Sequence, residues 1–249
     1  MTDFENGSVL TVLHPGGSGA AVVVFPHAGG SPRFFRHWGE VLPATALIGV
    51  TYPGRDARRN ESYADGPHGD DLVGLARTAA DAIQAAGLAA PVLVGHSLGA
   101  YVAYEAAAAL TRAGVLGVRL VVSGQTPPDH RPTTTLHRGA DDDLVADIIR
   151  QNPDSAQLWE LEELRARFLP AVREDYRLLE TYAPSAAIVP ELLVCYSDRD
   201  DEICAETIGT WHRYAHLAHP PAVFTGGHFY LQAPDEQLPR RLAASFGLG

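Results

Sequence analysis

The apolar residues of this chain fall into short runs that alternate with stretches of helical periodicity. Seven runs rich in valine, leucine, isoleucine and alanine predict β-strands at 9–14, 20–26, 46–52, 91–94, 119–123, 191–197 and 222–225. Apolar positions three and four residues apart predict helices between most of them, at 32–42, 70–86, 100–110, 203–218 and 234–246. Strands that alternate with helices indicate an α/β fold, with a mostly parallel central sheet and helices on both faces.

This alternation stops after the strand at 119–123. Residues 125–137 are rich in proline and threonine, and two helical stretches follow at 141–151 and 156–182 with no strand between them. We therefore predict a helical lid at 130–185, inserted into a core formed by 1–129 and 186–249.

The junction between the strand at 91–94 and the helix at 100–110 carries the motif Gly95-His96-Ser97-Leu98-Gly99. A G-x-S-x-G motif between a strand and a helix is the nucleophile elbow of the α/β-hydrolase fold. The sharp turn presents the serine hydroxyl to substrate, and its glycines avoid backbone clashes. We predict an α/β-hydrolase fold with Ser97 as the nucleophile.

Serine is a weak nucleophile at neutral pH and needs a general base. His228 follows the strand at 222–225 and the turn Gly226-Gly227, where this fold places its catalytic histidine. Although the chain has 11 histidines, position singles out His228 as the base.

The triad also needs a carboxylate to orient the imidazole. Four acidic residues crowd the loop that follows the strand at 191–197, and a solvated acidic loop is the simpler explanation for most of them. We predict that Asp200 is the triad acid. Asp198 is its main competitor, and Asp129, which follows the strand at 119–123, is a third candidate.

A tetrahedral oxyanion needs two hydrogen-bond donors. In this fold one donor is the backbone N–H after the nucleophile, here that of Leu98, and the other lies in a loop after an earlier strand. That loop is Pro26-His27-Ala28-Gly29-Gly30-Ser31, and we predict that the Ala28 N–H is the second donor.

Composition limits the class of partner. The chain has 249 residues and a formal net charge of −11, which argues against binding to nucleic acid or to anionic membrane surfaces. No apolar run is long enough to span a membrane, and the acidic start of the chain lacks a secretory signal, so we expect a cytoplasmic protein. The two cysteines, Cys195 and Cys204, show no metal-ligand spacing, and we expect neither a disulfide nor a metal or other cofactor. The absence of lysine excludes Schiff-base catalysis.

With these residues placed, the chain resembles the type II thioesterases that accompany polyketide synthases and nonribosomal peptide synthetases. The most specific matches are the runs Tyr52-Pro53-Gly54-Arg55 and Gly226-Gly227-His228-Phe229-Tyr230-Leu231. A third match, Leu169-Pro170-Ala171-Val172-Arg173-Glu174-Asp175, falls in the predicted lid. The matches span nearly the whole chain, although His27 stands where the family usually has an aromatic residue.

The resemblance implies hydrolysis of acyl groups from the phosphopantetheine arm of carrier proteins, through an acyl-Ser97 intermediate. It implies the roles already given for Ser97, Asp200, His228, Ala28 and Leu98, and a monomer as the default state. The partner is then an acyl or peptidyl carrier protein. We predict that at least one of two arginine clusters rims the lid entrance and docks this carrier. One cluster is Arg33, Arg36, Arg55, Arg58 and Arg59, and the other is Arg165 and Arg167 on the lid.

Two other catalytic functions fit the same residues, and a third alternative is non-catalytic. A small-molecule carboxylesterase or lipase would use the same triad, and an acyltransferase or cyclase would replace water with another acceptor. A non-catalytic binding protein of hydrolase fold would show a broken triad, whereas Ser97, His228 and a carboxylate are all present here.

Overall fold

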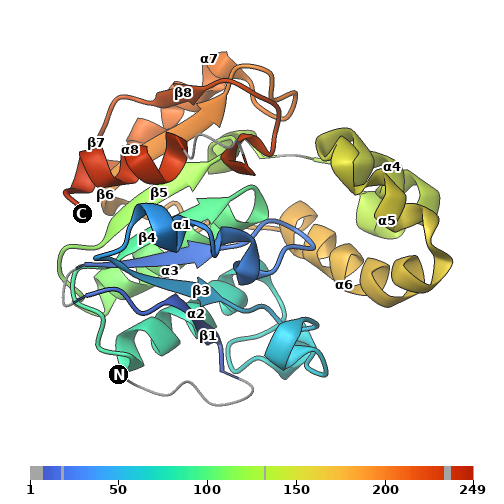
Figure 1. Cartoon of the computed structure of the whole chain (residues 1–249), viewed down its shortest axis with the longest axis horizontal. Coiled ribbons are helices and arrows are strands. Elements are labelled where there is room, and N and C mark those ends of the chain that lie inside the picture. Colours follow the sequence, from blue (N-terminus) through green and yellow to red (C-terminus); the bar gives the residue numbers. More distant parts are fainter. Residues whose placement is uncertain (1–7, 18–19, 132, 233–236, 249) are drawn as a thin grey trace.

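The computed structural model describes residues 8–17, 20–131, 133–232 and 237–248. The acidic start of the chain, which is predicted to lack a secretory signal, lies outside these residues. So do residues 234–236, the predicted beginning of the last helix. Within the described residues, eight strands form one central sheet, with helices on both faces (Figure 1). The strands are β1 (Leu10–His14), β2 (Ala21–Phe25), β3 (Ala46–Val50), β4 (Val92–His96), β5 (Arg119–Ser123), β6 (Val189–Ser197), β7 (Ala215–Ala218) and β8 (Ala222–Phe224).

The sheet order is β1-β3-β2-β4-β5-β6-β7, and β8 also pairs with β6. Among the described strands, only β1 runs antiparallel to its neighbour; the other pairs are parallel. Every residue of β2 and β4 is buried, as expected for parallel strands covered on both faces. The carboxyl ends of β4, β6 and β8 therefore meet at one edge of the sheet, where this class of fold places its site.

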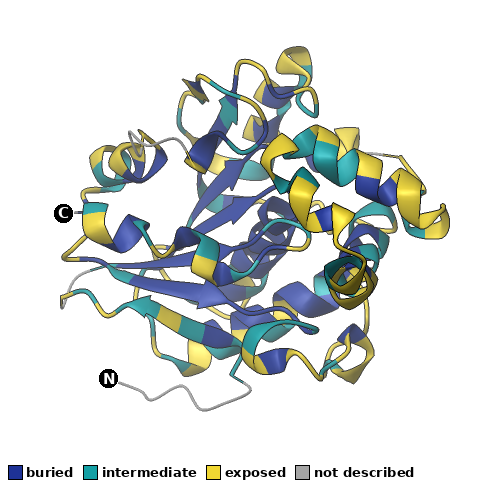
Figure 2. Cartoon of the chain, turned by 45° about the vertical axis from the view of Figure 1, so that its right-hand side comes forward, coloured by how far each residue is buried: buried dark blue, intermediate teal, exposed yellow. Residues whose placement is uncertain are grey.

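The helices are α1 (Trp38–Val41), α2 (Leu72–Ala85), α3 (Leu98–Arg112), α4 (Asp141–Gln151), α5 (Ala156–Glu160), α6 (Glu162–Glu180), α7 (Ala205–Ile208) and α8 (Gln237–Phe246). One apolar core lies between the sheet and the pair α2 and α3, and a second lies between the sheet and α1 and α8. The buried sheet and the exposed outer faces of these helices are visible in Figure 2. None of the described helices is both long and apolar enough to cross a lipid bilayer.

Two predicted helices are wrong in type. The stretch predicted as a helix at 32–42 is a 3-10 turn (Pro32–Phe35) followed by the single turn α1. The three-residue period of a 3-10 turn puts Phe35 and Trp38 on one face, where both are fully buried with ring centroids 5.0 Å apart.

The helix predicted at 203–218 is also wrong beyond its first turn. It consists of α7, a 3-10 helix (Gly209–Tyr214) and then β7, which pairs with β6 from Val189↔Ala215 onward. The edge of β6 supplies hydrogen-bonding partners that the local apolar pattern could not reveal.

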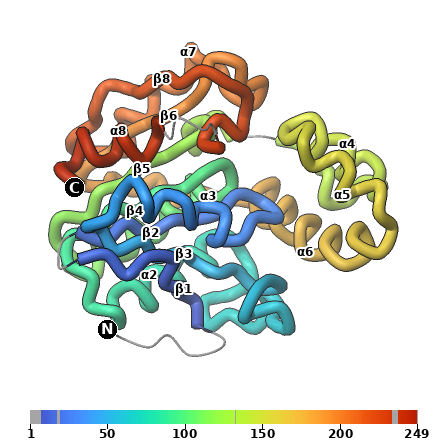
Figure 3. The backbone as a smooth tube through the Cα atoms, in the orientation of Figure 1, coloured from blue at the N-terminus to red at the C-terminus, as the bar shows by residue number. Residues whose placement is uncertain are grey.

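Between β5 and β6 the chain leaves the sheet, forms α4, α5 and α6, and returns to the neighbouring strand (Figure 3). The helix predicted at 156–182 is interrupted at Leu161, whose extended backbone separates α5 from α6. These helices have a small apolar core of their own, made by Leu144, Val145, Trp159, Leu169, Val172 and Tyr176. We call α4–α6 the helical segment.

Candidate active site

Ser97 lies at the sharp turn between β4 and α3. Its φ of 54° and ψ of −123° place it in a strained region of backbone space, which costs about 1–3 kcal/mol. A Cβ on Gly95 would lie 2.0 Å from the Gly99 carbonyl oxygen, and one on Gly99 would lie 2.1 Å from the Phe25 carbonyl oxygen. The turn can therefore form only because both flanking positions are glycine.

His228 lies just beyond β8, and its ring is held by the loop that follows β6. Its Nδ1 donates to Asp200 Oδ2 over 2.9 Å, and both side chains are buried. The second oxygen of Asp200 accepts from the Glu202 N–H at 3.0 Å. A proton on Nδ1 leaves Nε2 with a free lone pair, and among the described residues buried Nε2 has no hydrogen-bonding partner. The imidazole is thus oriented as a base.

The other two acidic candidates contact different groups. Asp198 Oδ1 accepts from the Gly226 N–H at 3.0 Å, so it fastens the turn that precedes His228. Asp129 is partly exposed and pairs with its neighbour His130. Of the three carboxylates predicted as possible triad acids, the structure brings Asp200 to the imidazole.

Ser97 and His228 lie at the same end of the sheet. The rings of His96 and His228 have centroids 4.8 Å apart, and Ser97 and Phe229 line one cavity. No hydrogen bond within the described part of the chain joins the Ser97 hydroxyl to His228 Nε2. Catalytic hydrogen bonds are often long or poorly aligned without substrate and tighten only when it binds.

The loop after β2 forms a tight turn beside Ser97. The Gly30 N–H donates to the His27 carbonyl at 2.9 Å, and Gly29 has a φ of +73°, as the third residue of a type II turn requires. Ala28 and Ser97 line the same cavity. We call residues 27–30 the oxyanion turn. Its place fits the predicted role of the Ala28 N–H, alongside the N–H of Leu98, which opens α3.

Two further imidazoles surround the site. Burial lowers the pKa of His96 well below its usual value, and the nearby His228 and His27 rings lower it further. Its Nδ1 lies 3.0 Å from the Ser123 hydroxyl, which lies 2.7 Å from the Tyr230 hydroxyl. A neutral His96 therefore packs beside His228 without adding positive charge. Neither Ser123 nor Tyr230 was predicted as a site residue, because residues so far apart in sequence meet only through the sheet.

The His27 imidazole should make the free energy of unfolding depend on pH in the acid range. Burial lowers its pKa from 6.5 to about 3, with smaller contributions from His228 and Arg55, and its ring lies edge-on to Phe34 and Phe229. Between these two pH values the unfolded chain binds a proton that the folded chain does not, so the free energy of unfolding falls as pH falls through this window.

Replacing His27 with phenylalanine removes this dependence on pH and suits the aromatic surroundings. We expect the free energy of unfolding of His27→Phe to rise relative to that of wild type as the pH is lowered. Below pH 6 this difference should grow by up to about 1 kcal/mol for each pH unit. Urea denaturation at a series of pH values between 7 and 4 measures it. A difference that stays constant with pH would contradict the assignment.

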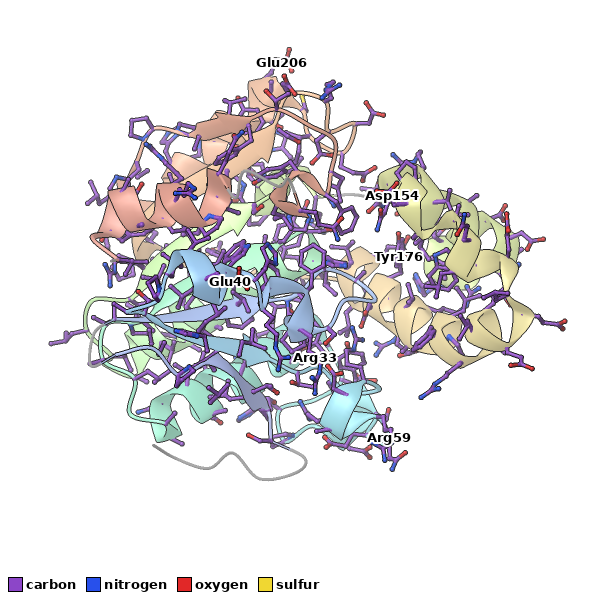
Figure 4. The ribbon with its side chains drawn as sticks, in the orientation of Figure 1. Arg33, Glu40, Arg59, Asp154, Tyr176 and Glu206 are labelled. Atoms are coloured by element: carbon purple, nitrogen blue, oxygen red, sulfur yellow. The ribbon has the colours of Figure 1, made fainter. Side chains whose placement is uncertain are left out.

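A cavity of about 340 Å³ opens at Ser97, between the core and the helical segment. This volume is typical of small-molecule pockets. The core contributes Ser97 and the oxyanion turn, and the helical segment contributes most of the apolar wall, namely Ile148, Leu158, Trp159, Phe168 and Val172. Tyr176 of α6 also lines it and lies where the helical segment meets the core (Figure 4). An acyl chain attached to Ser97 could enter this space.

The predicted arginine patch is wrong in two of its members. Arg58 is buried against Glu61 and the Thr51 carbonyl, and Arg55 is largely buried against Asp175. Arg33, Arg36 and Arg59 are exposed, and Figure 4 shows Arg33 and Arg59 on the side of the core near the helical segment. Because the guanidiniums of Arg55 and Arg58 are buried, they cannot form part of a docking surface.

Among the described residues, no group of three histidine, cysteine, aspartate or glutamate side chains is arranged to hold a metal ion. Cys195 is buried in β6 and Cys204 is exposed; both are free thiols. Burial raises the pKa of the Cys195 thiol, as expected of an inert core residue.

The fold and this site define an α/β-hydrolase with a serine nucleophile elbow. Comparison with known proteins narrows the class. A family model described as a thioesterase domain matches residues 20–245. The chain belongs to this thioesterase family, and it is a thioester hydrolase.

Individual relatives are similar over most of the chain. Thioesterase PikA5 of Streptomyces venezuelae is 33% identical over 240 residues, which cover 93% of this chain and 84% of the relative. A probable cadicidin biosynthesis thioesterase of Streptomyces griseus is 33% identical over 89% of this chain, but this match spans only 61% of the relative's length. The solved structure of YbtT, a type II thioesterase from the yersiniabactin pathway, superposes with a TM-score of 0.84, at 29% identity over 96% of this chain and 98% of that one.

Proposed function

We propose that this chain is an editing thioesterase, which hydrolyses acyl groups from the phosphopantetheine arm of carrier proteins in polyketide or nonribosomal peptide biosynthesis. The observation that carries this proposal is the strained Ser97 opening onto an apolar cavity beside the Asp200–His228 pair. The similarity to PikA5 and to the type II thioesterase YbtT supports the substrate class.

The geometry supports the following reaction. The Ser97 hydroxyl attacks the thioester carbonyl while His228 Nε2 accepts its proton, and the buried Asp200 carboxylate stabilises the imidazolium. The Ala28 and Leu98 N–H groups hold the oxyanion, and the C–S bond breaks as His228 returns the proton to the departing thiolate. Water, activated by the same imidazole, then releases the acid from acyl-Ser97. The acyl chain occupies the cavity while the helical segment limits its length.

Substrate preference tests the proposal. We expect kcat/KM for an acyl carrier protein thioester to exceed that for the p-nitrophenyl ester of the same acid by about tenfold or more, because contacts with the remote carrier and arm assist the reaction. Free acid should be the product. A preference for the ester would favour a small-molecule carboxylesterase, and transfer of the acyl group to another acceptor would favour an acyltransferase. Absence of both turnover and labelling by a fluorophosphonate would favour a non-catalytic binding protein.

A further inference from the structure

A buried carboxylate of the helical segment reaches the oxyanion turn. Asp175 lies in the middle of α6, and its side chain is fully buried. Its Oδ2 accepts from the Gly29 N–H at 2.7 Å, across 146 positions of sequence. None of the catalytic steps described above uses this residue.

Arg55 joins the same cluster from the loop after β3. Its guanidinium donates to both oxygens of Asp175, at 2.7 and 2.9 Å, and to the Gly30 carbonyl at 3.0 Å. Tyr63 donates its hydroxyl to Asp175 Oδ1. The Asp175 carboxylate therefore has all its hydrogen-bonding capacity filled by three donors, one of which belongs to the oxyanion turn.

The oxyanion turn is held from outside at two points, and a third contact holds Pro26, the residue that precedes it. Asp175 holds the Gly29 N–H, Arg55 holds the Gly30 carbonyl, and the buried Tyr52 hydroxyl donates to the Pro26 carbonyl at 3.1 Å. The central peptide of a type II turn is reversed relative to type I, so a fixed acceptor for the Gly29 N–H selects one orientation. Tyr52 and Arg55 belong to the Tyr-Pro-Gly-Arg run, which the triad chemistry leaves unexplained.

Packing adds to these hydrogen bonds. Val172, one turn before Asp175 on α6, lies so close to Gly29 that a Cβ there would be 3.0 Å from its Cγ2. Gly29 has a φ of +73°, which disfavours any larger residue. The outside contacts therefore add to the turn's own hydrogen bond from the Gly30 N–H to the His27 carbonyl. Oxyanion stabilisation depends on donors held in place before reaction.

We propose that Asp175, together with Arg55, is a positioning residue that fixes the oxyanion turn from helix α6. The proposal rests on the proposed function, in which the Ala28 N–H of this turn stabilises the oxyanion. An amide at position 175 has one acceptor oxygen instead of two, so it cannot serve Gly29, Tyr63 and the guanidinium together.

The test compares Asp175→Asn with Glu180→Gln, a matched control. Glu180 also lies on α6, and its nearly buried carboxylate also accepts backbone N–H groups, but those belong to Leu136 and His137. We expect Asp175→Asn to lower kcat for the carrier thioester by about 10²-fold, as for loss of an oxyanion donor, with KM changed less than about threefold. Glu180→Gln should retain kcat.

A second readout reports the oxyanion itself. A trifluoromethyl ketone carrying the acyl chain bonds to Ser97 Oγ as its carbonyl electron pair moves onto oxygen and the serine proton passes to His228. Its inhibition constant should rise in Asp175→Asn by a factor similar to the loss in kcat. An unchanged kcat, or an equal loss in Glu180→Gln, would overturn the proposal.

A third variant tests the proposal even if Asp175→Asn does not fold. Arg55→Met combined with Asp175→Leu removes both charges and leaves neither unpaired. It should fold and show the same loss of kcat; a folded double variant with wild-type kcat would overturn the proposal. Ser97→Ala, assayed in parallel, separates the two hypotheses: if it keeps turnover the proposed function fails, whereas its inactivity beside a fully active Asp175→Asn rejects only the positioning role.

Discussion

Replacing His228 with glutamine is expected to lower kcat for thioester hydrolysis by about 10⁴-fold or more. The glutamine amide can still donate to Asp200, which keeps that buried carboxylate paired, but it cannot take the proton from Ser97. The loss therefore reports on base catalysis and not on a disrupted core. Steady-state rates with an acyl carrier substrate measure it, alongside thermal denaturation to confirm folding.

His216→Gln is the matched control. This histidine lies exposed in β7, away from the catalytic triad, and its replacement should leave kcat unchanged. If the His228 variant kept more than about a tenth of wild-type kcat, the imidazole would not be the general base.

Replacing Asp200 with asparagine is expected to lower kcat by about 10³- to 10⁴-fold. The Asp200 carboxylate accepts the Nδ1 proton of His228 at 2.9 Å. An asparagine N–H in its place favours the tautomer with its proton on Nε2, and that nitrogen then cannot accept the serine proton. The imidazolium formed during attack also loses its buried counter-charge.

Asp198→Asn is the control for this result, because Asp198 lies two residues away and accepts from the Gly226 N–H. Its amide oxygen can keep that contact, so we expect a change in kcat of less than about threefold. A larger loss for Asp198→Asn than for Asp200→Asn would transfer the role of triad acid to Asp198.

Local patterns were enough to predict the strand, turn and helix around Ser97. Ser97 sits between a buried strand and a helix, and its two glycines occupy positions where a Cβ would lie about 2 Å from backbone oxygens. The predicted strand at 119–123 and helix at 141–151 coincide with β5 and α4, because a short apolar run and a helical apolar period mark them. The fold class followed from this alternation.

Local sequence patterns could not predict the features that depend on contacts between residues far apart in the chain. Which acidic residue after β6 meets His228 depends on the geometry of two strand ends, and the structure brings Asp200 to this ring. The burial of Arg55 depends on Asp175, 120 positions away, so a basic residue that looked like a surface charge is internal. In the same way, β7 forms because β6 offers it an edge.

The acyl-enzyme itself provides the most direct test. Wild-type protein mixed briefly with an acyl carrier thioester, quenched in acid and digested, should carry the acyl mass on the peptide that contains Ser97, and Ser97→Ala should show neither this adduct nor turnover. An acyl group found instead on another residue, such as the exposed Cys204, or turnover that survives in Ser97→Ala, would contradict a serine-based mechanism.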